Sequence, residues 1–375
     1  MQEEPTAHYQ YYGTASKASE VNAFIDHILA NQGHPRTTGQ QRTPICIWGK
    51  HGIGKTELVA SWAKEKGYAF AYIAPAQFEE MGDLIGMPSI EHGKTVFKAP
   101  AWVPTAEGPG ILLIDDVNRA DDRILRGIMQ LLQNYELVSW QLPAQWHIIL
   151  TANPDGGDYS VTPMDDAMLT RMLHITLTFD VLEWAKWAEK NEIDPRGIQF
   201  VLTHPTSLIG ERTTPRTLVQ FFAHLASIPD LRQQLPLVKS LADSCLDENT
   251  VTAFVTFVMQ GLDRLPQPAE LLRSSNFEQE IQQPIAAVVQ QGTLRVDILA
   301  SLCTRLVNYL SLHDIQPNPQ ELANIQAFIK LPFLPSDLRF ALAQDLVGSP
   351  NPHLGALIGD PVIGKLVLEG MGGGE

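Results

Sequence analysis

The sequence has few cysteines, no long apolar run and no cluster of basic residues, and each shortage excludes a class of protein. Its three cysteines, Cys46, Cys245 and Cys303, are odd in number and widely spaced among apolar neighbours. They predict buried, reduced thiols and exclude a disulfide framework or a cysteine metal site. No apolar stretch is long enough to span a membrane, and the first residues lack the basic-then-apolar layout of a signal peptide. We therefore expect a cytoplasmic protein with no membrane span.

Basic side chains are also scarce relative to acidic ones. The 375 residues include 27 Lys and Arg against 42 Asp and Glu, a net charge of −15. An extended nucleic-acid surface needs clustered Lys and Arg to neutralise phosphates, and no stretch here combines a basic run with interleaved aromatics. Nucleic acid is therefore the less favoured partner, although a local patch on an acidic protein stays open. The length allows two or three domains with a large core.

The most specific motif lies between residues 43 and 56. The apolar run Ile45–Trp48 predicts a short strand that is buried on both faces. Gly-x-x-x-x-Gly-Lys-Thr follows at residues 49–56 and matches the phosphate-binding P-loop, and apolar residues at helical spacing then lead to a stop at Gly67. Strand, glycine loop and helix are the context that this motif needs. The sequence therefore predicts a nucleoside triphosphate site.

Each residue type in the loop has a physical reason. Glycines let backbone amides curl around a phosphate, and the helix start adds its positive end. Lys55 is expected to reach the β- and γ-phosphates as a point charge, and the Thr56 hydroxyl is expected to bind Mg²⁺. The other expected nucleotide contacts come from the rest of the loop and its helix start: Gly49, Lys50, His51, Gly52, Ile53, Gly54 and Glu57.

Two further apolar runs end in polar side chains. Residues 110–116 form a predicted strand that ends in Asp115 and Asp116, sixty residues after Lys55. We expect Asp115 to hold the Mg²⁺ shell and Asp116 to polarise the attacking water. Residues 146–153 predict another strand with Asn153 at its tip, whose amide is expected to contact water or the γ-phosphate. The alternative is that Asn153, next to a proline, simply caps a turn.

The order of predicted elements indicates the architecture. Strands alternate with helices over residues 43–179, which is typical of an α/β fold with a mostly parallel sheet covered on both faces. We expect a nucleotide-binding domain at 1–180 with a poorly ordered segment of about 17 residues at its start. A helical lid is expected at 181–264, and a further helical region at 265–375 with a flexible Gly-rich tail and a possible partner-binding role. The remaining expectations are a hairpin at 90–97 that turns at His92-Gly93, one helical stretch at 237–263 and another at 278–291.

These residues together resemble a known family. The P-loop, Asp115-Asp116, Asn153, Arg171 and Arg216 stand in the order and spacing of an AAA+ ATPase. Three segments look like the MoxR-like branch: Asp-Asp-Val-Asn-Arg-Ala at 115–120, Leu-Thr-Ala-Asn-Pro at 150–154 and Met-Asp-Asp-Ala-Met-Leu-Thr-Arg at 164–171. The resemblance covers residues 20–225, and the last third of the chain resembles no family that we can name.

The resemblance implies an AAA+ P-loop core with a helical lid, assembled into a ring, commonly a hexamer, with MgATP between neighbouring subunits. Asn153 is then sensor 1 and Arg216 sensor 2, whereas Arg171 is the arginine finger that reaches the next subunit's γ-phosphate. A planar, always charged guanidinium suits that task. The family usually works on a client together with a protein that carries a von Willebrand factor A domain. The hairpin at 89–97 occupies the place of the family's helix-2 insert, which faces the ring's pore.

Two positions depart from the family pattern. Asp116 stands where the family has glutamate, and the shorter side chain holds its carboxylate farther from an in-line water, so hydrolysis is expected to be slow. Thr170 replaces the acid before the arginine finger. The first interpretation is an ATP-hydrolysing remodeller. The alternative is an ATP-dependent assembly switch or scaffold with weak hydrolysis, and a DNA helicase or clamp-loader relative would need a basic channel.

Overall fold

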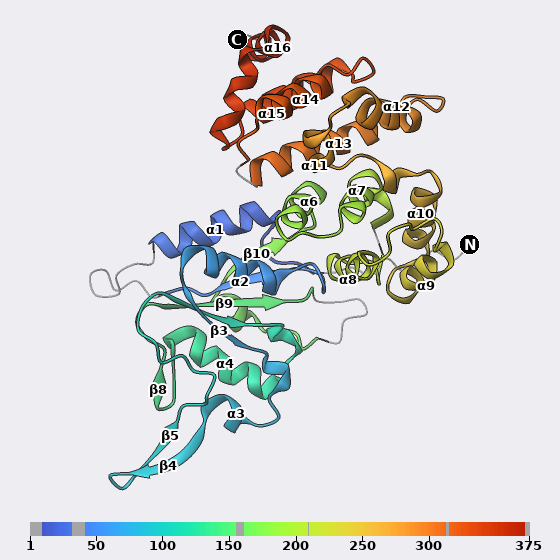
Figure 1. Ribbon diagram of the computed structural model, residues 1–375. Coiled ribbons are helices and arrows are strands. Elements are labelled where there is room, and N and C mark those ends of the chain that lie inside the picture. The colour runs from blue at the N-terminus through green and yellow to red at the C-terminus, as the bar shows by residue number, and fades with distance from the viewer. Residues whose placement is uncertain (1–9, 32–41, 155–160, 209, 313–314, 372–375) are drawn as a thin grey trace. The chain divides into compact units, whose positions relative to one another are not determined.

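The computed structural model describes residues 10–31, 42–154, 161–208, 210–312 and 315–371. The chain divides into two compact units, residues 1–180 and residues 181–375 (Figure 1). Of the expected features, the Gly-rich tail beyond Met371 and the first nine residues lie outside the described residues. No helix in the described ranges is long and apolar enough to cross a membrane.

A parallel sheet organises the first unit. Its strands follow the spatial order β1-β10-β2-β9-β6-β3, and each neighbouring pair is parallel. The strands have these bounds: β1 Thr14–Ser16, β2 Ile45–Trp48, β3 Ala69–Ile73, β6 Gly110–Ile114, β9 Trp146–Ala152 and β10 Leu173–Leu177. The order places β2, β9 and β6 in the middle of the sheet. The P-loop and the residues after β6 and β9 therefore meet at one edge, where the carboxyl ends of the strands lie.

Helices cover both faces of this sheet, as the continuous apolar runs of the central strands predict. On one face, α1 (Ala18–Asn31) and α2 (Lys55–Lys66) pack against alternate strand residues such as Ile45 and Ile47 (Figure 1). On the other face, α4 (Asp122–Asn134) packs in the core that contains Cys46 and Trp48. The remaining short helices of the unit are α3 (Met81–Ile85) and α5 (Asp166–Leu169), with 3-10 turns at Pro75–Gln77 and Val117–Arg119. The predicted α/β core is confirmed.

Two hairpins extend from the unit. The first pairs β4 (Met87–Glu91) with β5 (Lys94–Lys98) and turns at His92-Gly93, as predicted. The second, β7 (Glu136–Leu137) with β8 (Trp140–Gln141), was not predicted, because two-residue strands are too short to show an alternating pattern. The Phe97 amide donates to the Ser139 hydroxyl at 3.0 Å and joins the two hairpins.

The second unit is helical. Its helices are α6 Val181–Lys190, α7 Pro195–Thr203, α8 Pro215–Leu225, α9 Leu235–Cys245, α10 Glu248–Met259, α11 Pro268–Arg273, α12 Gln283–Val289, α13 Val296–Leu312, α14 Pro319–Ile329, α15 Ser336–Val347 and α16 Pro361–Met371. Buried phenylalanines form part of its core: the Phe254 ring lies edge-on to Phe200 and Phe221, with ring centroids 4.9 and 4.8 Å apart. A buried ion pair at 3.0 Å joins Arg305 of α13 to Glu189 of α6. The division at 264/265 stays a prediction.

The structure corrects the sequence predictions in three places. Residues 14–16 form the edge strand β1 rather than a poorly ordered segment, because they pair with β10. The stretch 237–263 is not one helical run, because Asp247 leaves the helical conformation and its carboxylate accepts from the Arg212 and Thr213 amides at 3.0 and 2.6 Å. The stretch 278–291 starts with a π-helical turn at Glu278–Gln282 before α12.

Candidate nucleotide-binding site

The P-loop connects the end of β2 to the start of α2. Gly54 caps the helix with φ 103°, a left-handed conformation that a residue with a Cβ rarely adopts. A Cβ built there would meet no atom within 4 Å, so the backbone conformation, and not crowding, explains the glycine. The Gly49 amide donates to the Ala152 carbonyl at 3.2 Å and ties the start of the loop to β9. The loop therefore has a defined shape that depends on the neighbouring strand.

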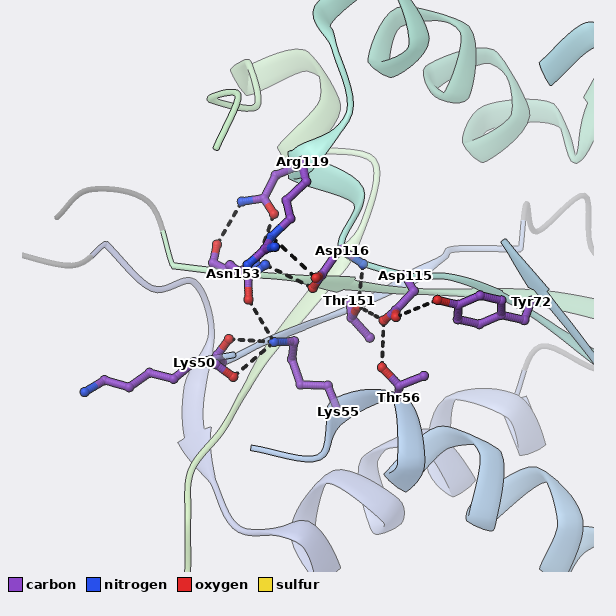
Figure 2. A network of polar contacts seen from close by, with 11 residues as sticks. Lys50, Lys55, Thr56, Tyr72, Asp115, Asp116, Arg119, Thr151 and Asn153 are labelled. Carbon is purple, nitrogen blue, oxygen red and sulfur yellow. Dashed lines mark hydrogen bonds and ion pairs between the residues drawn. The ribbon is translucent and has the colours of Figure 1, made fainter. Parts of the chain in front are cut away.

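Lys55 is buried, with 5% of its surface exposed. Its ammonium group donates to the Gly49 carbonyl at 2.7 Å, to the Lys50 carbonyl at 3.2 Å and to the Asn153 amide oxygen at 3.1 Å (Figure 2). A buried ammonium is stable only when its protons are matched by acceptors. Lys55 therefore lies as a fixed positive charge between the loop and the end of β9.

Asp115 follows β6 and accepts hydrogen bonds from three hydroxyl groups. Its Oδ1 accepts from Thr56 at 2.8 Å and from Thr151 at 2.5 Å, and its Oδ2 accepts from Tyr72 at 3.1 Å (Figure 2). Partial burial, and then the charge of this neighbouring carboxylate with its hydrogen bond, raise the pKa of Tyr72. The carboxylate is thus oriented from both sides, with one oxygen against the Thr56 hydroxyl at the start of α2.

Asp116 is held in a second cluster. Its backbone is left-handed, with φ 46° and ψ 46°, a conformation that aspartate tolerates better than most residues. The Asn153 amide nitrogen donates to its Oδ1 at 3.0 Å, and the Arg119 Nε lies 3.5 Å from its Oδ2. Asn153 is in turn fixed by Asn118, which donates to its carbonyl at 2.8 Å and accepts from its amide N–H at 3.1 Å. Asn153 therefore bridges Lys55 and Asp116 and is fully buried.

This arrangement fits the phosphates of a nucleoside triphosphate with a Mg²⁺ ion. Thr56 and Asp115 present a hydroxyl and a carboxylate oxygen 2.8 Å apart, and Mg²⁺ prefers such oxygen donors. The glycine loop leads directly into the positive end of α2, which together with Lys55 suits a phosphate chain. Of the other predicted loop contacts, Lys50, His51 and Glu57 are exposed and Ile53 is half-buried. Their roles stay predictions.

The two predicted arginines come from other segments of the chain. Arg171 lies in the turn after α5, where its guanidinium donates to the Ala167 carbonyl and lies 3.4 Å from the Gln133 side-chain oxygen. Arg216 belongs to the second unit, where it is exposed on the first turn of α8 after Pro215. The roles of both as arginine finger and sensor 2 stay predictions.

Four residues of the cluster, Thr151, Tyr72, Asn118 and Arg119, were given no role from the sequence. Thr151 lies inside an apolar strand, Tyr72 lies near the end of β3, and Arg119 follows the acidic pair by three residues. Asn118 and Arg119 lie in the 115–120 segment and Thr151 lies in the 150–154 segment that resemble the MoxR-like branch, whereas Tyr72 lies in none of these segments. The contacts of Thr151 and Tyr72 depend on which strands are neighbours in the sheet.

Comparison with known proteins agrees with the P-loop architecture. Residues 44–172 match the model of the AAA domain of the dynein-related subfamily. No curated protein sequence matches the chain. Among solved structures, the chain is similar to the RuvB Holliday junction branch migration motor of Thermotoga maritima, with 16% identity, 78% of this chain and 86% of that chain covered, and a TM-score of 0.37.

A second similar structure is Hsp104 in a closed state with ATPγS and casein, with 14% identity, 59% of this chain and 46% of that chain covered, and a TM-score of 0.40. Both TM-scores are below 0.5, so the assignment of the fold depends on the family match and on the strand–loop–helix geometry and not on these two structures. This chain therefore has the AAA+ P-loop NTPase fold, a parallel sheet flanked by helices, followed by a helical C-terminal region.

Proposed function

We propose that the protein is an ATPase that binds MgATP and uses its hydrolysis to remodel or activate a partner protein. The observation that carries this proposal is the continuous chain of contacts from Thr56 through Asp115 and Thr151 on one side and from Lys55 through Asn153 to Asp116 on the other. These contacts bring three kinds of group to one end of the P-loop: two oxygens suited to Mg²⁺, an ammonium suited to phosphate, and a carboxylate that can orient a water molecule.

Each side chain has one task in this proposal. Lys55 binds the β- and γ-phosphates, and Thr56 with Asp115 holds Mg²⁺, which neutralises charge on the phosphates. Asp116 orients the attacking water, and Asn153 keeps both Lys55 and Asp116 in place. The Asp116 carboxylate accepts from the Asn153 side-chain amide at 3.0 Å, and this contact supports a fixed orientation of the carboxylate.

We propose further that the protein is MoxR-like and acts as a ring, commonly a hexamer, with Arg171 completing the site of the neighbouring subunit and Arg216 acting on the subunit's own nucleotide. Support comes from the motif order of the chain and from the AAA domain match over residues 44–172. A protein with a von Willebrand factor A domain is the proposed partner, and the client is a protein of unknown identity. A cytoplasmic location belongs to the same proposal.

A second candidate is an ATP-dependent assembly switch with weak hydrolysis. The contacts of Asp116 favour it: one oxygen accepts from Asn153 and the other lies 3.5 Å from Arg119. A general base must hydrogen-bond the water that it activates, and a carboxylate engaged on both oxygens does so less readily. ATP would then stabilise the ring, and hydrolysis would be incidental.

Steady-state ATP hydrolysis over a wide range of protein concentrations distinguishes the two candidates. A specific activity that rises with concentration and then saturates supports an ATPase whose sites are completed between subunits. Lys55→Ala is expected to abolish nucleotide binding, whereas Arg171→Ala is expected to keep binding and lose turnover. Background turnover at every concentration with tight ATP binding favours the switch, and normal affinity in Lys55→Ala contradicts the site assignment.

The partner proposal has its own test. A chain without residues 265–375 is compared with the full chain for ATP binding and for capture of a purified von Willebrand factor A domain protein. Lost capture supports partner recruitment by the helical C-terminal region when ATP binding is retained and circular dichroism shows that residues 181–264 keep their helices without Arg305, the buried partner of Glu189. Capture that is unchanged by the deletion contradicts that role.

A further inference from the structure

A hydrogen-bonded chain on β10 lies outside the nucleotide cluster but connects it to Arg171. The Trp48 indole Nε1 donates to the His174 Nδ1 at 3.0 Å, and the His174 Nε2 lies 2.8 Å from the Leu169 carbonyl. Trp48 is the last residue of β2 and directly precedes Gly49 of the P-loop. Leu169 is the last residue of α5 and lies two positions before Arg171. The imidazole therefore joins the start of the P-loop to the turn that carries the arginine.

Hydrogen-bond chemistry selects one form of this imidazole. An indole N–H can only donate, so the Nδ1 of His174 must accept and carries no proton. The remaining proton is then on Nε2, which donates to the Leu169 carbonyl. Both ring nitrogens are thus used, and the ring direction is determined at both ends.

Several main-chain hydrogen bonds close the turn around Arg171, and one of their acceptors, the Leu169 carbonyl, also contacts the His174 ring. The Leu169 carbonyl accepts from the His174 ring and also from the Met172 amide, at 3.3 Å, and both donors follow Arg171 in the chain. The Arg171 amide donates to the Met168 carbonyl at 3.1 Å. Since α5 has only four residues, it has little helical structure of its own to hold the arginine in place. Leu173, the first residue of β10, joins the end of this turn to the sheet because its amide donates to the Pro44 carbonyl at 2.9 Å, and His174 adds a side-chain contact from the same strand.

Packing keeps the imidazole in this position. The Tyr12 ring lies against Trp48 and His174, with ring centroids 4.7 and 5.7 Å away. Gly13 follows with φ 80°, and a Cβ there would lie 2.2 Å from the His174 carbonyl, so the N-terminal segment approaches β10 as closely as the backbone allows. Trp48 is 1% exposed and shares one core with Met168 and Met172, which flank the turn.

We propose that His174 is a positioning residue that sets the location of Arg171 through the Leu169 carbonyl. This inference rests on the proposed function, in which Arg171 acts on the neighbouring subunit's nucleotide. It makes a specific prediction: in a His174 variant Arg171 is misplaced, whereas the nucleotide site of the same subunit stays intact. A residue that merely supports the fold would damage both.

The first measurement compares His174→Phe with wild type in ATP binding and turnover. Phenylalanine keeps an aromatic ring against Tyr12 but loses both hydrogen bonds. Misplacing a catalytic group by about 1 Å lowers turnover by roughly 100-fold, and we expect a loss on the order of 10- to 100-fold with ATP affinity nearly unchanged. The matched control is His147→Phe on β9, an imidazole with an unpartnered buried Nδ1, which is expected to keep wild-type turnover.

The decisive measurement mixes subunits. Lys55→Ala subunits have no nucleotide site but carry an intact Arg171, so they should complete the sites of His174→Phe subunits in mixed rings. A mixed rate well above the sum of the two separate rates supports the inference. The reference mixture is Arg171→Ala with Lys55→Ala, which tests action between subunits without involving His174.

The outcomes separate the inference from the proposed function. Recovery in the reference mixture without recovery for His174→Phe overturns the inference and leaves the function standing, as does wild-type turnover in His174→Phe alone. No recovery in either mixture, or no turnover in wild type, overturns the proposed function and the inference with it. If His174→Phe does not fold, His174→Asn replaces it, because its short amide can accept from Trp48 in place of Nδ1 but does not extend to the Leu169 carbonyl.

Discussion

Replacing Thr151 by valine tests whether the two acidic residues after β6 are held by one hydroxyl. That hydroxyl donates to Asp115 Oδ1 at 2.5 Å and accepts from the Asp116 amide at 2.8 Å. Thr151 is fully buried, and valine has nearly the same shape. The substitution therefore removes the two hydrogen bonds while leaving the packing of β9 intact.

The expected loss of stability follows from these two contacts. A hydrogen bond to a charged group contributes about 1.5–3 kcal/mol, and a buried N–H left without a partner costs about 1–3 kcal/mol. The added methyl group offsets about 0.8 kcal/mol. We expect a decrease of roughly 2–5 kcal/mol in the free energy of unfolding. The Mg²⁺ concentration needed for half-maximal ATP binding should also rise, because Asp115 loses its shortest hydroxyl contact.

Thr176→Val is the matched control. Thr176 is buried on β10, which β2 separates from β9 in the sheet, and its hydroxyl donates to the neutral Tyr12 carbonyl at 2.9 Å. Losing a neutral bond costs about 0.5–1.5 kcal/mol before the methyl group is counted. Urea unfolding monitored by tryptophan fluorescence gives both free energies, and ATP titration at several Mg²⁺ concentrations gives the second readout. Equal destabilisation by both substitutions, with unchanged Mg²⁺ dependence, would refute the reasoning.

Three further predictions concern other parts of the chain. Asp116→Glu should raise turnover by about 10-fold or more, since general-base catalysis depends on reach; unchanged turnover with intact ATP binding would point to the assembly switch. Burial, with a smaller contribution from a nearby arginine, lowers the pKa of His147 to about 4, so the folded state favours the neutral ring. The resulting contribution to the free energy of unfolding is fully present above pH 6.5 and is lost as pH falls toward 4, by at most about 1.4 kcal/mol per pH unit. The free energy of unfolding of His147→Gln should therefore depend less steeply on pH over this range. Arg305→Met should destabilise the second unit by about 3–5 kcal/mol, because it leaves Glu189 buried without its partner, whereas Arg126→Met at an exposed pair should change stability by about 0–1 kcal/mol in the same urea assay.

Local sequence patterns were sufficient for the parts of the fold that depend on near neighbours. The apolar run before Gly49 predicted a buried strand, and Gly67 predicted the end of α2, where the structure has a left-handed cap. The turn of the β4–β5 hairpin at His92-Gly93 was likewise predicted from two residues. In each case the preference is set by backbone conformation or by burial of one short segment.

Local sequence patterns gave wrong predictions where a contact with a residue distant in the chain determines the secondary structure. Residues 237–263 read as one helical stretch, but the Asp247 carboxylate binds amides that lie more than thirty residues earlier in the chain, so the helix ends there. Residues 14–16 carry no strand signal of their own and form β1 because an edge of the sheet is available to them.

The sequence by itself determined which chemical groups this protein has for a nucleotide: a glycine loop, Lys55, Thr56 and two carboxylates after a buried strand. These groups follow from residue types at fixed spacing along the chain, which do not depend on how the strands pack. Only the tertiary structure decided how those groups meet, because Thr151, Tyr72 and Asn153 reach the acidic pair from other strands, and strand order is a property of the whole sheet. The same holds for His174, whose imidazole on β10 contacts the Leu169 carbonyl in the turn before Arg171.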